Sequence, residues 1–536
     1  MKRKMAVLVA GVMLMSSLAA CTDSSEDSSE GQATESTEST QSDESASSDT
    51  VKADKTLDLF VNFTWFPSDS WTGIIPETIT EKTGIAFDVT RATDENQLGV
   101  MIASGELPDV IFTDSSLDRL SDSSVCYSYN ELIDKYNIDW KPDDERIAIA
   151  QNKNLDKDDD NYYTLLSAYS TNAEWESAKD VVAPQLGCLY YRKDIWEALG
   201  SPKMDTMEDI VNVLEMVKEK YPDMIPLSAG SPTWRFTPFY EWFGGRPEFL
   251  YDEADGEIKY RDTTENFYNA AKFVNSLYQK GLFPEENLAI TNQDDAKQQF
   301  TVGKSFMYEW NGRTLHVDEL KSEIQRNITD ADVAIVPIPD DSKEIQTSDA
   351  GWAGVFISKN CKDPEAAIKM ISYLNSDEGR RLVVWGREGT DYTLDKDTDM
   401  PHFSDEWKEA QKDADLFTKK YNANYIMTNT QIDELKSYFA DADQTVVESL
   451  LKNTDKVVRH PELGMVIPQT STDEGIIYSK IEEARKAETM KLFTADSDED
   501  FEKAYENYME LLKKMGVEQL NEYAKTAAED VLAKLS

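Results

Sequence analysis

The chain has 536 residues, with 102 acidic and 55 basic side chains and a formal net charge of −47 at pH 7. Nucleic-acid binding needs clustered lysine and arginine, so this charge argues strongly against nucleic acid as a partner. The length exceeds what one hydrophobic core usually fills, and two domains are expected.

The first twenty residues have the order of an export signal. Lys2, Arg3 and Lys4 precede an apolar run that ends at Leu18, and Cys21 follows directly after Leu-Ala-Ala. The run is shorter than the roughly 20 residues that span a bilayer, which favours a cleaved signal peptide over residues 1–20. Its end resembles the lipobox of bacterial lipoproteins. That resemblance implies a lipid on Cys21 and a place on the extracellular face of the cell membrane; an ordinary signal peptide is the alternative.

Residues 21–55 are rich in Ser, Thr, Glu and Asp, and no aromatic residue occurs after Cys21 before Phe60. Such a segment buries too little apolar surface to offset its chain entropy, so it is predicted to be disordered. Its like charges favour an extended tether between the membrane and the folded part. A glycosylated stalk is the alternative.

The first folded stretch alternates strand and helix patterns. Strands are predicted at 57–63, 85–89 and 109–112, with helices at 74–82 and 94–104 between them. This alternation predicts a mainly parallel sheet, and ligands bind outside the carboxyl ends of such strands. Trp65 and Asp114 follow two of these ends.

The second stretch continues the mixed pattern. Thr206 and Asp209 predict a capping box, and Asp363 with Pro364 predicts another helix start. Apolar runs favour further strands near 186–191, 332–338 and 351–357, and a helical tail begins at Ser497.

Several segments, taken in chain order, resemble family 1 extracellular solute-binding proteins, and in particular their oligosaccharide-binding lipoproteins. A match to one segment alone is weak evidence, but the whole set in this order is specific. The segments are 77–85 with 103–109 (ASGELPD), 190–200 (YYRKDIWEALG), 302–312 (VGKSFMYEWNG), 363–379 and 386–392 (GREGTDY).

This resemblance implies an α/β, two-lobed periplasmic-binding-protein-like fold of class II, with a mainly parallel sheet flanked by helices in each lobe and a C-terminal helical extension. Lobe 1 is expected to comprise 56–183 and about 345–395, and lobe 2 to comprise 184–344 and about 396–536. The chain would cross near 183–190 and 339–352. The implied function is capture of a carbohydrate, favouring an oligosaccharide, by a monomer that delivers it to the permease subunits of an ABC importer.

Sugar sites combine aromatic platforms for C–H faces with polar groups for hydroxyls. Trp310 lies in a family-like segment, and Trp65 and Asp114 lie at strand ends. A tryptophan is also a common core residue, and that alternative stays open for Trp242, Trp352 and Trp385. The predicted ligand-binding residues are Trp65, Asp114, Trp234, Arg235, Glu241, Trp242, Trp310, Asn311 and Trp352.

One acidic loop has calcium-like spacing. Asp156, Asp158 and Asp160 match the first three ligands of a calcium loop, but Ser167 stands where a bidentate glutamate is needed. An acidic surface loop before a strand at 162–166 is the favoured interpretation, with calcium binding as the alternative, and no other cofactor is expected.

Catalytic motifs are missing from the sequence. The three histidines are scattered, and neither a Gly-x-Ser-x-Gly elbow nor a phosphate-binding loop occurs. Mainly on the family resemblance, the prediction is a binding protein and not an enzyme. A lipid-anchored glycoside hydrolase remains the alternative because carboxylate pairs are abundant, and a surface sensor or adhesin is a third. Cys126, Cys188 and Cys361 show no metal or disulfide spacing and are predicted to be core residues.

Overall fold

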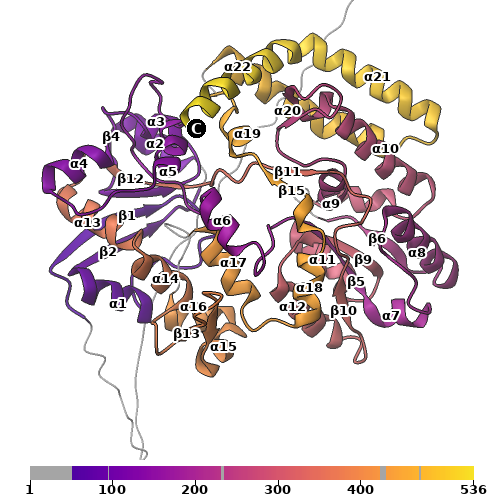
Figure 1. Ribbon diagram of the computed structural model, residues 1–536, viewed down its shortest axis with the longest axis horizontal. Coiled ribbons are helices and arrows are strands. Elements are labelled where there is room, and N and C mark those ends of the chain that lie inside the picture. The colour runs from indigo at the N-terminus through magenta and orange to yellow at the C-terminus, as the bar shows by residue number, and fades with distance from the viewer. Residues whose placement is uncertain (1–50, 95, 231–234, 423–429, 470–471, 536) are drawn as a thin grey trace, which may run out of the picture. The chain divides into compact units, whose positions relative to one another are not determined.

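The computed structural model describes residues 51–94, 96–230, 235–422, 430–469 and 472–535 (Figure 1). The predicted signal peptide, Cys21 and most of the predicted tether lie outside these residues, as does Trp234. Among the described helices, none combines the length and apolarity needed to cross a membrane.

A five-stranded sheet forms the centre of lobe 1, in the order β2-β1-β3-β12-β4. β1 pairs in parallel with β2 and β3, whereas β12 runs antiparallel to both β3 and β4. The strands are β1 (Lys55–Val61), β2 (Ile85–Arg91), β3 (Val110–Thr113), β4 (Cys126–Tyr127) and β12 (Gly354–Ser358).

A second sheet, of four strands, forms the centre of lobe 2 in the order β10-β5-β9-β6. β9 pairs in parallel with β6, whereas β5 runs antiparallel to both β9 and β10. The strands are β5 (Gly187–Arg192), β6 (Ile225–Ser228), β9 (Ser305–Asn311) and β10 (Val333–Ile335).

Each sheet is therefore mixed, with one strand running against the rest. In each sheet the antiparallel strand is the first one after a crossing: β5 follows the first crossing and β12 follows the second. The crossing segments join the lobes at the edge where the other strands end, so β5 and β12 begin at that edge. The register places Gly187 opposite Asn311, and Gly354 opposite Thr113. The crossings and the carboxyl ends of β9 and β3 thus share one edge in each lobe.

The helices of lobe 1 pack on both faces of its sheet. α1 ends at Thr83, one residue after the predicted bound, and is capped by Gly84, whose φ of 72° suits glycine; the Asp363 side chain accepts from the Ala366 amide to begin α13. The helices are α1 (Ile74–Thr83), α2 (Gln97–Ser104), α3 (Leu117–Leu120), α4 (Tyr129–Tyr136), α5 (Asp144–Gln151), α13 (Pro364–Leu374), α14 (Asp377–Trp385), α15 (Asp405–Gln411) and α16 (Ala414–Tyr421).

Lobe 1 extends beyond the expected boundary near residue 395. Phe403, Trp407 and Tyr421 are buried in the same hydrophobic cluster as Leu57 of β1 and Trp385 of α14. The sequence pattern missed this because α15 and α16 are short and carry few apolar residues. Their large aromatic rings supply the burial instead.

Lobe 2 has its own set of helices. The capping box between Thr206 and Asp209 at the start of α8 is confirmed. The helices are α7 (Lys193–Ala198), α8 (Met207–Lys220), α9 (Thr237–Trp242), α10 (Glu265–Gln279), α11 (Gln293–Thr301), α12 (Thr314–Gln325) and α18 (Gln444–Leu451). A hairpin of β7 (Phe249–Tyr251) with β8 (Ile258–Tyr260) and a strand pair of β11 (Ile345–Thr347) with β15 (Val457–Arg459) complete it. The hairpin of β13 (Tyr392–Leu394) with β14 (Pro401–Phe403) belongs to lobe 1, where Tyr392 and Phe403 are buried.

The C-terminal helical extension is confirmed. Phe501, Tyr508 and Leu512, which lie in the predicted helical tail, are buried in the lobe 2 core with Phe267 of α10. The extension consists of α19 (Pro461–Met465), α20 (Asp473–Phe493), α21 (Asp498–Met515) and α22 (Val517–Leu535), seen at the top of Figure 1.

Two sequence predictions in lobe 1 were wrong in detail. The stretch 162–166 is not a strand, although Leu166 forms an isolated bridge with Gly354, and its residues are buried as irregular chain. α2 begins at Gln97 and not at Asp94, whose carboxylate accepts from the Asn96 amide instead. The prediction that Cys126, Cys188 and Cys361 are core residues is confirmed, since all three are buried free thiols.

Candidate functional site

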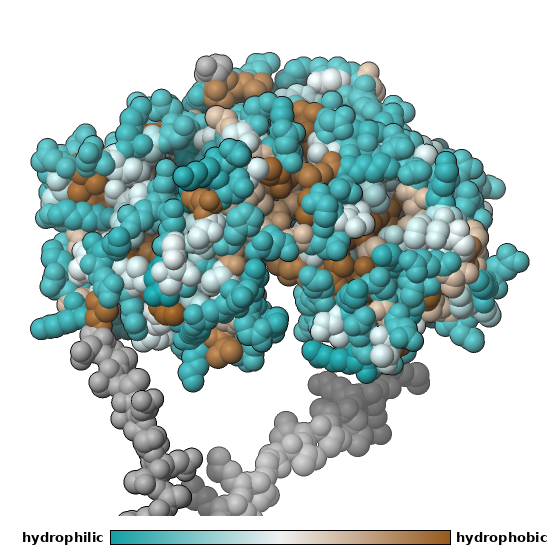
Figure 2. Space-filling view, turned by 60° about the horizontal axis from the view of Figure 1, so that its bottom comes forward, coloured by the Kyte–Doolittle hydropathy of each residue, from teal (hydrophilic) through white to brown (hydrophobic). Residues whose placement is uncertain are grey.

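An aromatic surface lies at the carboxyl edge of the lobe 1 sheet. Phe63 and Trp65 follow β1, and Trp352 lies two residues before the start of β12. The Phe63 ring centroid lies 5.0 Å from that of Trp65 and 5.1 Å from that of Trp352, and the two indoles are 6.2 Å apart at 31°. The Trp65 side chain is 57% exposed, which is unusual for tryptophan. Figure 2 shows apolar residues in a hollow at the middle of the face that it presents.

Polar groups follow the same strands. Asn62 donates through Nδ2 to Thr113 Oγ1 at 3.1 Å and to Ser115 Oγ at 3.0 Å, while its Oδ1 is buried without a hydrogen-bond partner. Asp114 lies between these two acceptors in the chain and is exposed, yet desolvation by the surrounding chain raises its pKa. This edge therefore offers both an aromatic face and carboxylate and amide oxygens.

The corresponding edge of lobe 2 carries Trp310. Its indole stacks on the imidazole of His316, with centroids 3.6 Å apart and planes inclined by 3°. His316 therefore covers one face of the indole, and a ligand could stack only on the other. Burial, together with the nearby Arg313, lowers the pKa of His316 to about 3, so its imidazole is neutral at physiological pH. His316 carries no sequence signal for this role, because the spacing of the three histidines bears only on metal binding.

Asn311 and the first crossing segment meet beside Trp310. With its amide oriented to satisfy both neighbours, Gln185 accepts from Asn311 Nδ2 at 3.3 Å and from Arg313 Nη2 at 3.0 Å. The Asn311 side chain is buried, and its Oδ1 has no hydrogen-bond partner. Gln185 was not predicted as a site residue, although it lies within the expected crossing.

Glu241 lies under the same crossing. Its carboxylate is 2% exposed and accepts from the Gly187 amide at 2.7 Å, and Arg246 Nε lies 3.5 Å from its other oxygen. Burial raises the pKa of Glu241 to about 7, against the opposing charge of Arg246. The neighbouring Trp242 is 3% exposed and packs edge-on against Phe239, at 5.4 Å and 79°. Its ring thus contributes to the core of lobe 2, which leaves it no surface for a ligand.

Arg235 points toward the backbone of lobe 2. Its Nη2 donates to the Ile290 carbonyl at 2.6 Å. The buried Glu309, directly before Trp310 in β9, accepts from the Gly230 and Phe236 amides at 3.0 and 2.8 Å. Burial raises the pKa of Glu309 to about 7. Glu309 was not predicted, and its place beside Trp310 was the only available signal.

Two short helices join the lobes, α6 (Asn172–Ala178) and α17 (Gln431–Phe439). Their apolar residues, including Trp175 and Phe439, belong to a core cluster of lobe 2 that also contains Tyr190. Because the helices otherwise face α5 and α14 of lobe 1, their polar residues are available for contacts between the lobes.

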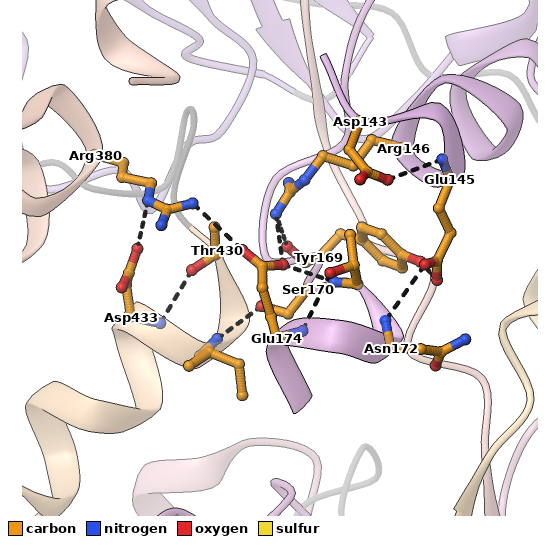
Figure 3. Close-up of polar contacts among 12 residues, drawn as sticks. Asp143, Glu145, Arg146, Tyr169, Ser170, Asn172, Glu174, Arg380, Thr430 and Asp433 are labelled. Carbon is orange, nitrogen blue, oxygen red and sulfur yellow. Dashed lines mark hydrogen bonds and ion pairs between the residues drawn. The ribbon is translucent and has the colours of Figure 1, made fainter. Parts of the chain in front are cut away.

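Those contacts form the network in Figure 3. Glu174 is held from two sides, by Arg146 Nη2 at 3.1 Å and by Arg380 Nη1 at 3.3 Å, and Arg380 Nε lies 3.0 Å from Asp433 Oδ2. The Ser170 hydroxyl accepts from the Ile432 amide at 3.0 Å. This network connects α6 and the residues just before it with α17 and two helices of lobe 1.

The three aspartates with the spacing of a calcium loop do not form a metal site. Asp156, Asp158 and Asp160 are exposed, and Asp156 Oδ1 accepts from the Asp158 amide. Within the described part of the chain, no three His, Cys, Asp or Glu side chains come together in a way that could hold a metal ion.

The two-sheet architecture and the shared edges define the class of two-lobed solute-binding proteins. A family model described as bacterial extracellular solute-binding protein matches residues 76–383, more than half of the chain. The chain therefore belongs to the bacterial extracellular solute-binding protein family.

Curated relatives agree with this assignment. The fructooligosaccharide ABC transporter substrate-binding protein FusA of Streptococcus pneumoniae is 24% identical over 242 residues, 41% of this chain and 43% of FusA, so less than half of that relative is matched. A carbohydrate ABC transporter substrate-binding protein of the same organism is 22% identical over 71% of this chain and 74% of its own length. Lipoprotein LipO of Bacillus subtilis is 25% identical over 58% of this chain and 62% of LipO.

Solved structures confirm the two-lobed fold. The alginate-binding protein AlgQ2 without calcium superposes with a TM-score of 0.62 and 17% identity, covering 90% of this chain and 99% of AlgQ2. FusA in complex with kestose gives the same TM-score and identity over 89% of this chain and 99% of FusA.

Proposed function

We propose that this protein captures a neutral oligosaccharide outside the cell and delivers it to the permease of an ABC importer. The observation that carries the proposal is the exposed indole of Trp65 at the carboxyl edge of lobe 1, which lies beside the partly exposed Trp352 and packs on the buried ring of Phe63. Aromatic faces of this kind pack against the C–H faces of sugars. The carbohydrate transport named for FusA and for the second relative supports the same conclusion.

The charge of the chain favours a neutral ligand over an acidic one. A formal charge of −47 repels anions over distances comparable to the Debye length. The similarity to FusA, solved with kestose, therefore fits better than the similarity to alginate-binding AlgQ2, since alginate is a polyanion.

We assign the site to residues of both edges. Trp65, Trp352 and Asp114 meet the ligand from lobe 1, and the partly exposed Trp310, with Lys297 Nζ 5.9 Å from its ring centroid, meets it from lobe 2. Asn311, Glu241 and Arg235 support the lobe 2 edge by their hydrogen bonds.

Titration calorimetry tests the function. Kestose, nystose, maltotriose and raffinose are the probes, and saturable binding of at least one without release of monosaccharide is expected. Release of monosaccharide would favour the glycoside hydrolase alternative, and no binding of any neutral oligosaccharide would contradict the proposal. X-ray scattering with the bound probe should give a smaller radius of gyration, because lobes of this class close around ligand by hinge rotation.

Anchoring of the chain at the membrane belongs to the same proposal. Cys21 after Leu-Ala-Ala supports a lipid on that residue, and the similarity to a lipoprotein agrees with it. In cells fed labelled palmitate, the wild-type protein should take up label and the Cys21→Ala variant should not. Equal labelling of both proteins would contradict the anchor.

A further inference from the structure

A polar pocket lies where the two crossing segments pass lobe 2. Its volume is about 330 Å³. The first crossing contributes Gln185 and Leu186, the second contributes the stretch from Gln346 to Asp349, and lobe 2 contributes Glu241, Arg246 and Arg261 among others. The pocket adjoins the proposed site, because Gln185 contacts Asn311 and Arg313 beside Trp310.

The charges around this pocket are mixed. Arg246 and Arg261 supply guanidinium donors, while Glu241, Glu248 and Asp349 supply carboxylate acceptors. Three carboxylates against two guanidiniums disfavour an anionic occupant, and a cation would meet the two arginines. A neutral polyhydroxylated group suits the lining, since each hydroxyl both donates and accepts.

The polar groups are paired within the protein but keep further hydrogen-bonding capacity. One oxygen of the buried Glu241 accepts from the Gly187 amide, and the other is ion-paired with Arg246, whose Nε lies 3.5 Å away. Arg261 donates through Nη1 to the Arg246 carbonyl at 2.7 Å, and Asp349 Oδ2 accepts from Thr347 Oγ1 at 3.0 Å. A carboxylate offers about four acceptor positions and a guanidinium about five donors, so these groups can also bind the hydroxyls of an occupant.

The lining also limits how much of a ligand fits. Among the described residues that line the pocket none is aromatic, and their side chains offer mainly hydrogen bonds. Its volume lies at the lower end of the roughly 300–1,000 Å³ found for pockets that hold whole ligands. One sugar unit at the end of a longer chain therefore fits better than a complete oligosaccharide.

We propose that this hinge pocket binds the terminal unit of the oligosaccharide, with Arg246 and Asp349 hydrogen-bonded to its hydroxyls. The inference rests on the proposed function and extends it to chain-length selection. Asp349 lies on the second crossing and Arg246 on lobe 2, so an occupied pocket also links ligand to the hinge.

Calorimetry with kestose and nystose, and with maltotriose and maltotetraose, tests the pocket. The wild-type protein should bind one member of a series at least tenfold more tightly than its neighbour in length. Arg246→Gln and Asp349→Asn should each remove most of this difference and weaken the preferred member at least tenfold. Arg326→Gln and Asp330→Asn, exposed positions of lobe 2 outside the pocket, are the matched controls and should retain it.

A third pocket variant controls for loss of folding. Ser348→Leu adds bulk to the pocket without removing a charge and should have the same effect on chain-length preference, with melting temperatures recorded for every free variant. Binding by the wild type together with unchanged preference in all three variants would overturn the hinge pocket and leave the proposed function intact. Absence of any oligosaccharide binding by the wild type would overturn both.

Discussion

The indole of Trp310 lies parallel to the imidazole of His316, with 3.6 Å between ring centroids. The pair spans the end of β9 and the first turn of α12, and it is partly exposed only on the tryptophan side. The stack thus joins a proposed ligand-binding indole to a histidine whose pKa depends on how well the indole shields it from water.

Removal of this indole should change the titration of His316. In Trp310→Ala, solvent reaches the imidazole, and because burial is the main cause of its low pKa, the pKa should rise from about 3 toward the ordinary value near 6.5. Nuclear magnetic resonance can follow this directly, since the chain has only three histidines. His402 and His460 are the internal controls, and an unchanged His316 titration would contradict the stacking role.

Loss of the Trp65 side chain should weaken binding with little effect on stability. About 80 Å² of lost stacking area at 25 cal/mol per Å² is roughly 2 kcal/mol, or about thirtyfold in affinity. The indole is already 57% exposed, so the melting temperature of free Trp65→Ala should stay close to wild type. Trp242→Ala is the contrasting variant, because its buried ring should cost about 3–5 kcal/mol of stability. A large stability loss in Trp65→Ala would place that ring in the core.

The sequence was most informative where a local signal and the tertiary fold agree. The capping residues Thr206 and Asp363 and the helix end at Gly84 were predictable, because capping depends on neighbours within one turn. The strand ends that carry Trp65 and Trp352 were also predictable in position, but whether each ring is exposed depends on contacts with distant segments.

The remaining site residues depend on such distant contacts. Glu241 and Trp242 are neighbours in sequence, yet one faces the first crossing and the other faces Phe239 in the core. Gln185, His316 and Arg246 carry no motif, and only the meeting of the crossing with β9 and α9 makes them part of the site. The reversed direction of β5 and β12 was likewise absent from the strand patterns, which contain no information on strand direction.

Protonation of Glu309 should make stability depend on pH. Its folded pKa of about 7 lies above the ordinary value of 4.5, so the folded chain holds a proton that the unfolded chain has lost between these values. Stability therefore falls as pH rises from about 4.5 to 7 and is level above. Glu309→Gln keeps an acceptor for the Gly230 and Phe236 amides and cannot ionise.

The melting temperature of Glu309→Gln relative to wild type should accordingly increase from pH 5 to pH 8. Glu241 and His316 titrate in both proteins, so the difference isolates Glu309. Scanning calorimetry at four or five pH values measures it, and a difference that is constant with pH would contradict a buried carboxylate with a raised pKa.

A methyl group at Gly187 should disturb the first crossing. A Cβ there would lie 2.8 Å from Thr237 Cγ2 and 2.9 Å from Pro238 N at the start of α9, closer than packed atoms allow. Gly187→Ala should cost about 1–3 kcal/mol, as overpacking usually does. Gly99→Ala is the matched control: it lies within α2 with no atom near its Cβ, and it should stabilise the chain by about 0.5–1 kcal/mol. Chemical denaturation measures both, and equal effects would contradict the close approach.

Breaking the pair between Arg380 and Asp433 should destabilise the joint between the lobes. Asp433 is 3% exposed, so Arg380→Gln leaves a buried carboxylate with fewer partners and should cost about 3–5 kcal/mol. Asp433→Asn should restore part of this loss in the double variant. A double-mutant cycle from denaturation gives the coupling, and strictly additive single effects would show that the two groups act independently.

The position of β12 has a consequence for how the chain reaches its folded state. β3 and β4 do not pair with each other but each pairs with β12, and Tyr129 donates to the Val355 carbonyl across 226 positions of sequence. The lobe 2 sheet, by contrast, lies entirely within residues 187–335. A chain that emerges from a ribosome or an export channel N-terminus first must therefore complete the second sheet before the first. Until the second crossing emerges, the edges of β3 and β4 stay unpaired, so folding should be slow and depend on protection from aggregation during synthesis.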